Sequence, residues 1–311
     1  MSSVSLRDLL EAGVHFGHQT RLWHPRMRPY IYGEKNGVHI IDLQKTAMQL
    51  NDALRFIQAT SARGQSILFV GTKRAAREIV ADQAGRSGMY FVNNRWLGGT
   101  LTNFKTVQKS IDGLIKLEKA RDEGRFESLT KKEALDLTRK ITKMDRSLGG
   151  IKDMKGLPGA MFVIDPKREY IAVREANKLG IPVVALCDTN CNPDNITHVI
   201  PGNDDALKSI HLFTQAIADA AIEGQASGRE QFVEDAALGG ADIENVEIYR
   251  RGSAEEEVEA APAEAEAAPA EAAAAEEAAA VEEAAAEVAA AEAPAEAAAE
   301  APAEEAAGTE E

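Results

Sequence analysis

The stretch SILFVGTKRAAREIV, residues 66 to 80, joins a short apolar run to a basic helical pattern. Its first part is apolar on successive residues, which is typical of a strand that is covered on both faces of a sheet. The second part, from Lys73, predicts a helix, with Gly71 at the junction. A strand, a glycine and a helix in this order begin many parallel α/β folds. The stretch therefore predicts an α/β domain.

The same alternation of strand and helix continues on both sides of this stretch. Strand-like runs occupy residues 38–43, 66–71, 89–92, 160–165, 182–187 and 197–200. Helical patterns lie near residues 44–62, 73–85, 169–179 and 204–225. Because parallel strands need crossover connections, this alternation predicts a doubly wound parallel sheet.

Residues 103–150 interrupt that rhythm, because they are too long for one crossover and too periodic for a loop. Apolar residues fall at helical spacing on both sides of a break at residues 123–125. They are Val107, Ile111, Leu114 and Ile115 before the break, and Leu135, Ile141, Met144 and Leu148 after it. We expect an inserted antiparallel helical hairpin, packed as a short coiled coil.

The net charge of −15 hides two unlike segments. Residues 1–228 hold 32 Lys and Arg against 25 Asp and Glu, whereas residues 229–311 hold 3 against 25. From residue 254 onward the chain is mainly 30 Ala and 19 Glu, without Lys, Arg or aromatic residues. We therefore expect a folded basic domain over 1–228, a linker over 229–253 and a disordered acidic tail over 254–311.

The chain has no feature of an exported or membrane protein. No apolar run approaches the roughly 20 residues that span a bilayer, and the first residues lack a signal sequence. Its two cysteines, Cys187 and Cys191, have no second pair with which to complete a zinc site. We expect a cytoplasmic protein whose cysteines are reduced thiols, one ending a buried strand and one in the next loop.

Two segments combine cations with aromatic rings, a third that begins at Lys73 is basic, and none contains the glycine fingerprint of a nucleotide-binding loop. Residues 13–33 contain three histidines, three arginines and four aromatic rings, and residues 93–105 repeat this chemistry around Gly98 and Gly99. The recurrence favours a surface for folded RNA. The residues expected to contact RNA are Arg21, Trp23, Arg26, Arg28, Lys73, Arg74, Arg77, Arg95, Trp96 and Lys105.

Each part of this surface has an expected role. Lys73 and Arg77 share a face at a helix N-terminus, where an external phosphate would be attracted. The amides of Gly98 and Gly99 would approach a phosphate, and Trp96 would stack on a base or brace its loop. A basic, solvated helix remains the alternative for the segment that begins at Lys73.

A second function stays open at the acids that follow the later strands. The carboxyl ends of parallel strands converge, so these acids are expected to lie together and near a histidine. The candidate metal ligands are His18, Asp188, Asp204 and Asp205. A nucleotide- or metal-dependent enzyme would use this cluster, whereas in a purely structural role the acids shape turns and cap a helix. A protein adaptor without RNA contacts is a third class.

Five strings of residues resemble the bacterial small-subunit ribosomal protein S2 family. They are LRDLLEAGVHFGHQTRLWHPRMRPYIYG, FVGTKRAAREIV, FVNNRWLGGTLTNFKTV, SLGGIKDMKGLPGAMFVIDPKREYIAVREANKLGIPVVALCDTN and VIPGNDD. The resemblance runs in order from about Val4 to Arg229. The long Ala/Glu tail departs from the family pattern, and the family does not require the cysteines of CDTNC.

The resemblance implies a flavodoxin-like domain with strand order 2-1-3-4-5 and a protruding helical hairpin. It implies a structural constituent of the ribosome that binds small-subunit ribosomal RNA where the head meets the body. It further implies docking of the large RNA-binding ribosomal protein S1 and contacts with neighbouring small-subunit proteins. Enzymatic activity, a cofactor, a membrane partner and a small-molecule substrate are not expected.

Overall fold

The computed structural model describes residues 4–239 of the chain. Its helices are α1 Leu6–Glu11, α2 Leu43–Ala62, α3 Arg77–Arg86, α4 Phe104–Asp122, α5 Lys131–Leu148, α6 Tyr170–Lys178 and α7 Leu207–Gly239. Its strands are β1 Phe16–Gln19, β2 Ile31–Lys35, β3 Val38–Ile41, β4 Ile67–Val70, β5 Tyr90–Val92, β6 Ala160–Ile164, β7 Val183–Cys187 and β8 His198–Pro201. Four short 3-10 helices complete the described elements: η1 Thr20–Leu22, η2 Pro25–Tyr30, η3 Arg125–Ser128 and η4 Gly149–Ile151.

Five parallel strands form the central sheet in the order β5-β4-β6-β7-β8. Counted along the chain within this sheet, the order is 2-1-3-4-5. The strands are buried on both faces, because successive residues enter different hydrophobic clusters. In β4, Ile67 and Phe69 join one cluster while Leu68 and Val70 join the other. This two-sided burial explains why the sequence of each strand is apolar without interruption.

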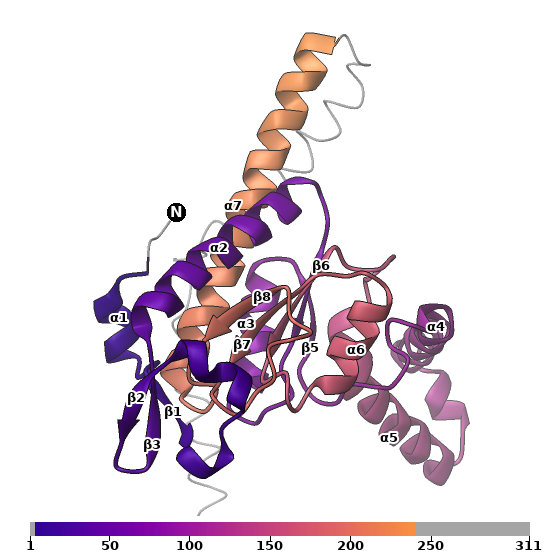
Figure 1. Cartoon of the computed structure of the whole chain (residues 1–311). Helices are drawn as coiled ribbons and strands as arrows, with labels where there is room; N and C mark the ends of the chain where they lie inside the picture. Colours follow the sequence, from indigo (N-terminus) through magenta and orange to yellow (C-terminus); the bar gives the residue numbers. More distant parts are fainter. Residues whose placement is uncertain (1–3, 240–311) are drawn as a thin grey trace, which may run out of the picture. The chain divides into compact units, whose positions relative to one another are not determined.

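Helices cover both faces of the sheet (Figure 1). The cluster on one face contains buried residues of α1, α2, α3 and α7. The cluster on the other face contains buried residues of α4, α5 and α6. Phe69, Phe162 and Phe213 are among the largest fully buried side chains, and all three belong to the first cluster. The predicted doubly wound α/β arrangement of the parallel sheet is confirmed.

One predicted strand belongs to a different sheet. Residues 38–43 were expected among the parallel strands, but β3 pairs with β1 and β2 in an antiparallel sheet. The reason lies in Asn36 and Gly37, which have φ of 53° and 74° and connect β2 to β3. An Asn-Gly pair adopts these left-handed angles readily, so it favours a two-residue hairpin. The Asn36-Gly37 pair is thus a hairpin signal in the sequence, which the assignment of residues 38–43 to the parallel sheet overlooked.

Two helices, α4 and α5, lie between β5 and β6 and contact each other. Thr130 begins α5 with a capping box, in which its hydroxyl and the Glu133 carboxylate each accept from a backbone N–H. The return to the sheet after α5 is tightly constrained. A Cβ added to Gly150 would lie 2.2 Å from the carbonyl oxygen of Phe91, so only glycine fits there.

Helix α7 continues to Gly239 and so enters the segment that was predicted to be a linker. The predicted disordered tail over 254–311 lies outside the described residues. None of the helices within residues 4–239 has both the length and the apolar composition that a bilayer span requires.

Helix α7 packs against α2 at a point where two backbones approach closely (Figure 1). A Cβ on Gly224 would lie 2.4 Å from the carbonyl oxygen of Gln58 in α2. Nearby, the Ser61 hydroxyl donates to the Ala221 carbonyl oxygen over 2.7 Å. The absence of a side chain at Gly224 therefore sets the distance between these helices.

We expect Gly224→Ala to lower the free energy of unfolding by about 1–3 kcal/mol, because the added methyl group forces the two backbones apart. Gly113→Ala is the matched control, since Gly113 lies in α4 with no atom within 4 Å of an added Cβ. That change should raise stability by about 0.5–1 kcal/mol through helix propensity. Thermal unfolding of the full chain measures both, and shifts of the same sign would contradict the close-approach argument.

Candidate nucleic-acid interface

The loops that leave the parallel strands meet at the carboxyl edge of the sheet, as the topology requires. They comprise residues 71–76 after β4, 93–103 after β5, 165–169 after β6, 188–197 after β7 and 202–206 after β8. The segment 13–33 is tied to the same edge through Thr189. The backbone N–H of His18 donates to the Thr189 hydroxyl over 3.0 Å, and that of His24 donates to the Thr189 carbonyl over 2.8 Å.

Segment 13–33 presents its cations to solvent. Arg21 and Arg28 are exposed, and Arg26 is also exposed but pairs with Asp194 of the loop after β7. Trp23 keeps 37% of its surface exposed, which leaves part of its ring available to a base. The structure thus places the four expected residues of this segment at the surface, with Arg26 already engaged by an acid.

The segment after β4 differs from its predicted form. Helix α3 begins at Arg77, so Lys73 lies in a preceding turn and does not share the helix N-terminus. The Lys73 ammonium lies 2.8 Å from an oxygen of Asp204 and 2.6 Å from one of Asp205. Because these acids already pair with Lys73, its charge is engaged inside the protein, and its contact with a phosphate stays a prediction. Arg74 remains exposed, and Arg77 is half-buried with its Nε donating to the Thr72 carbonyl.

The loop after β5 folds around one carboxylate. Glu175 of α6 accepts from the Trp96 indole and from the backbone N–H of Gly99 on Oε1. Its Oε2 accepts from the backbone N–H groups of Leu101 and Thr102 and from the Thr102 hydroxyl. The sequence gives no signal for this contact, because Glu175 lies far from the loop along the chain.

This arrangement bears on two expectations about the loop. The Gly99 amide, which was expected to approach a phosphate, donates to Glu175 over 2.7 Å. Trp96 is only 7% exposed, so its ring braces the loop and is not open for stacking on a base. Arg95 and Lys105, in contrast, are exposed on either side of the braced residues. The loop therefore offers cations on a fixed backbone, without an exposed ring from Trp96.

Two buried carboxylates of the segment 169–175 have opposite pKa shifts. Burial would raise the pKa of Glu175, but donors from Thr102, Gly99, Trp96 and Leu101 together outweigh it, and the pKa is lowered. Burial raises the pKa of Glu169, which accepts from both the amide and the hydroxyl of Thr72. Glu169 therefore ties the loop after β4 to α6, as Glu175 ties the loop after β5.

The predicted metal ligands come together in one cluster. One ligand atom each from His18, Asp188, Asp204 and Asp205 lies within 4.8 Å of the others. His18 Nδ1 lies 2.9 Å from Asp188 Oδ2, and the hydrogen bond to Asp188 raises the pKa of His18. Burial, with the nearby carboxylates of Asp165 and Asp188, raises the pKa of Asp204 to about 6. The prediction that these groups converge is confirmed.

The cysteines take the positions that were predicted from CDTNC. Cys187 is the last residue of β7 and Cys191 lies in the following loop, and both are buried free thiols. Burial raises the pKa of both thiols well above the ordinary value. They are therefore protonated at neutral pH and poor nucleophiles.

A cleft of about 400 Å³ separates the loop after β5 from α5. The sequence analysis predicted Arg95 as a contact but none of the cations on the α5 side. Its cations are Arg95 from the loop and Arg139, Lys143 and Arg146 from α5. We call it the α5 cleft. The spacing of the α5 cations places them on one helix face, but such a row in a sequence is usually a solvated face. The packing of α5 beside Arg95 is what distinguishes a cationic cleft from a solvated helix face.

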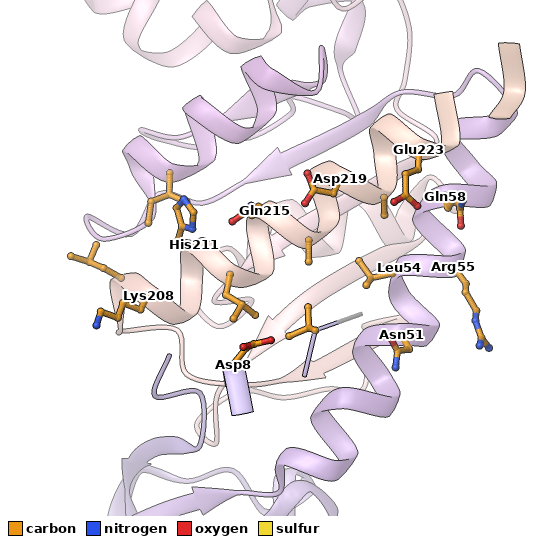
Figure 2. Close-up of a pocket in the computed structure, with 16 residues that line it drawn as sticks. Asp8, Asn51, Leu54, Arg55, Gln58, Lys208, His211, Gln215, Asp219 and Glu223 are labelled. Carbon is orange, nitrogen blue, oxygen red and sulfur yellow. The ribbon is translucent and has the colours of Figure 1, made fainter. Parts of the chain in front are cut away.

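A larger groove of about 860 Å³ lies between α2 and α7, and residues of α1 and α3 also line it. Its apolar side chains include Leu54, Ile79 and Leu212. Figure 2 shows polar side chains of both signs along its rim, among them Arg55 and Asp219. This mixture of charges does not favour a nucleic acid, so the groove is set apart from the candidate interface.

We expect the energetic effect of Glu175→Gln to depend on pH. At pH 7 the change should lower the free energy of unfolding by about 2–4 kcal/mol, because the amide nitrogen cannot accept from three donors. The lowered pKa of Glu175 means that its stabilising effect is complete above the unfolded-state pKa and is lost as the pH falls through the folded-state pKa. Unfolding of both forms in denaturant from pH 7 to pH 3 should show the two stabilities converging.

The exposed Glu34 supplies a control for this measurement. Glu34→Gln should change stability at pH 7 by less than about 0.5 kcal/mol. A difference between wild type and Glu175→Gln that stays constant down to pH 3 would show that the charge of Glu175 does not hold the loop.

The comparison with protein families agrees with these features. A family model described as ribosomal protein S2 matches residues 9–224. The match includes the antiparallel sheet, all five parallel strands, α4 and α5, and every loop of the carboxyl edge. Since it covers well over half of the chain, the chain belongs to the ribosomal protein S2 family.

Proposed function

We propose that this small-subunit ribosomal protein binds ribosomal RNA through cations around the carboxyl edge of its sheet. The observation that supports the proposal is the exposure of Arg21, Arg28, Arg74, Arg95 and Lys105 on segments that the sheet brings to one edge. The excess of cations in residues 1–228 adds a long-range attraction for phosphates.

The contacts are mainly with phosphates, which position a protein on RNA without reading its sequence. Arg21, Arg28 and Arg74 approach the backbone from two segments, and Trp23 offers a partly exposed ring for an unpaired base. Lys73 and Trp96 act inside the protein, where they hold the loops that carry the neighbouring cations.

The finer placement rests on the family resemblance. We propose that the protein lies between the head and the body of the small subunit and helps ribosomal protein S1 to dock. We further propose a flavodoxin-like classification with α4 and α5 as a protruding antiparallel hairpin, and a cytoplasmic location. A structural, non-enzymatic role fits the family, so the enzyme alternative is not favoured.

The docking proposal predicts that small subunits assembled without this protein lose ribosomal protein S1 during sedimentation in a sucrose gradient.

The RNA-binding proposal predicts a strong salt dependence. With about five phosphates engaged, log affinity should fall with log salt at a slope of roughly 3–5. Joint replacement of Arg21, Arg28 and Arg74 with alanine should reduce that slope by about 2–3, because each lost contact removes about one released counterion. Filter binding of the full chain to transcribed small-subunit RNA at several salt concentrations measures the slopes.

A control variant removes as many charges from another surface. Arg55, Arg63 and Lys178 are exposed on α2, after α2 and at the end of α6, outside the carboxyl edge. Their joint replacement with alanine should leave the slope nearly unchanged. A wild-type slope near zero, or equal losses in both variants, would contradict phosphate contact at the carboxyl edge.

A second candidate function is supported by the acidic cluster. Asp204 is fully buried, and its Oδ2 has no hydrogen-bond partner among the described residues. With neutral His18, the charges of Asp188, Asp204, Asp205 and Lys73 sum to −2, which one divalent cation would balance. Imidazole nitrogen and carboxylate oxygen together are ligands for zinc. We propose that the cluster binds a divalent cation for structural purposes, while Lys73 keeps its contact with Asp204 Oδ1.

Addition of Zn²⁺ to the metal-free full chain should raise its stability. At a free concentration of 100 times Kd, the gain in the free energy of unfolding is about 2.7 kcal/mol. Asp204→Asn should abolish the gain, whereas Asp136→Asn, at an exposed position of α5, should preserve it. Thermal unfolding with Zn²⁺, with Mg²⁺ and with a chelator makes the comparison. An identical wild-type midpoint in all three solutions would reject the cation site.

A further inference from the structure

We infer that the α5 cleft is a groove for the sugar-phosphate backbone of RNA, with Glu175 as the positioning residue of one wall. This inference deepens the proposed RNA-binding function and rests on it. It adds Arg139, Lys143 and Arg146 to the interface, together with a carboxylate that never touches the RNA.

The first wall is one face of α5. Arg139, Lys143 and Arg146 follow one another at intervals of four and three residues, and Thr138 and Thr142 line the cleft beside them. All five of these side chains are exposed. The row extends about 10 Å along the helix, given a rise of 1.5 Å per residue. A nucleic-acid strand with one phosphate every 3.4 Å of axis offers about three phosphates over that length.

The second wall is the start of the loop after β5. Arg95 and Asn94 line the cleft opposite α5. The Asn93 amide donates to the Arg77 carbonyl over 3.2 Å, which fixes the loop on one side of Arg95. Trp96, the next residue, donates to Glu175 over 3.2 Å and fixes the other side. Arg95 thus projects from a backbone that is held on both sides.

The charge of the cleft indicates its ligand. Four of the residues that line it are cations and none is an acid. Asp136 lies 3.7 Å from Arg139 at an exposed position and does not line the cleft. Adjacent cations of one sign repel one another, so an external anion relieves the repulsion. A ligand with evenly spaced phosphates matches the row better than a single small anion.

A second hollow adjoins the α5 cleft. It has a volume of about 390 Å³, shares Asn94 and Arg146 with the cleft, and is also lined by Arg77 and by Asp145, which pairs with Lys152. The shared residues place the α5 row next to Arg77 at the start of α3. A backbone in the α5 cleft would therefore lie beside the interface proposed above, which a pocket for free phosphate would not need to do.

The first experiment removes the α5 row. Arg139, Lys143 and Arg146 are replaced with alanine together in the full chain, and binding to transcribed small-subunit RNA is measured against salt. The slope of log affinity should fall by about 2–3, and the affinity near 0.15 M salt by roughly tenfold or more. Lys131, Lys132 and Lys140 are exposed cations of the same helix outside the cleft, and their joint replacement is the control.

The outcomes separate the two proposals. A wild-type slope near zero would reject RNA binding as a whole, and the cleft with it. A normal wild-type slope that the α5 variant retains would reject the cleft alone. An α5 variant that keeps its RNA affinity but leaves the small subunit in a gradient would show a protein partner, which also overturns the inference. Sodium phosphate at millimolar concentration should not compete with RNA for the wild type.

The second experiment tests the positioning role of Glu175. Glu175→Gln keeps one acceptor oxygen but turns a donor toward Leu101 and Thr102. The emission of Trp96 should shift toward longer wavelength, measured in a Trp23→Phe background. RNA affinity should fall about as far as in Arg95→Ala, with no further loss when both changes are combined. Additive losses, or a shifted emission with unchanged affinity, would show that Glu175 does not act through Arg95.

Discussion

The two-sided burial of a parallel sheet is the constraint on which the rest of this structure depends. Successive residues of each parallel strand enter two different hydrophobic clusters, so helices must cover both faces of the sheet. Because the strands are parallel, every connection must return from the carboxyl edge of the sheet to its amino edge. The loops after β4, β5, β6, β7 and β8 consequently meet at one edge. Cations and acids that are distant in the chain become neighbours there, as Lys73 and Asp204 show.

Carboxylates organise that edge. Glu175 holds the loop after β5, Glu169 holds Thr72, and Asp204 with Asp205 binds Lys73. Each acid satisfies donors that would otherwise be buried without partners, and each fixes a short segment next to an exposed arginine. The cations therefore have two uses. Some neutralise acids and hold the loops in place, and others stay exposed on loops that cannot easily move.

Periodicity in the sequence predicted the parallel strands and most helices, because burial on both faces produces runs such as residues 66–71. It failed for β3, where the Asn36-Gly37 turn outweighs an apolar run. Contacts between distant residues were out of reach. Nothing near Trp96 in the chain reveals Glu175, and nothing near Lys73 reveals Asp205. The cations of α5 were visible, but their neighbour Arg95 becomes apparent only in three dimensions.

Gly150 has a consequence for how this architecture can vary. Its contact with Phe91 anchors the base of α4 and α5 to the edge strand β5, and the α5 cleft lies near that anchored end. The turn at Gly124, with φ of 73°, lies at the other end of the helices. The end of α4 and the start of α5 can therefore be lengthened or shortened together by whole helical turns beside Gly124, without a change at Gly150. The length of α4 and α5 and the chemistry near Gly150 are in this way separately adjustable.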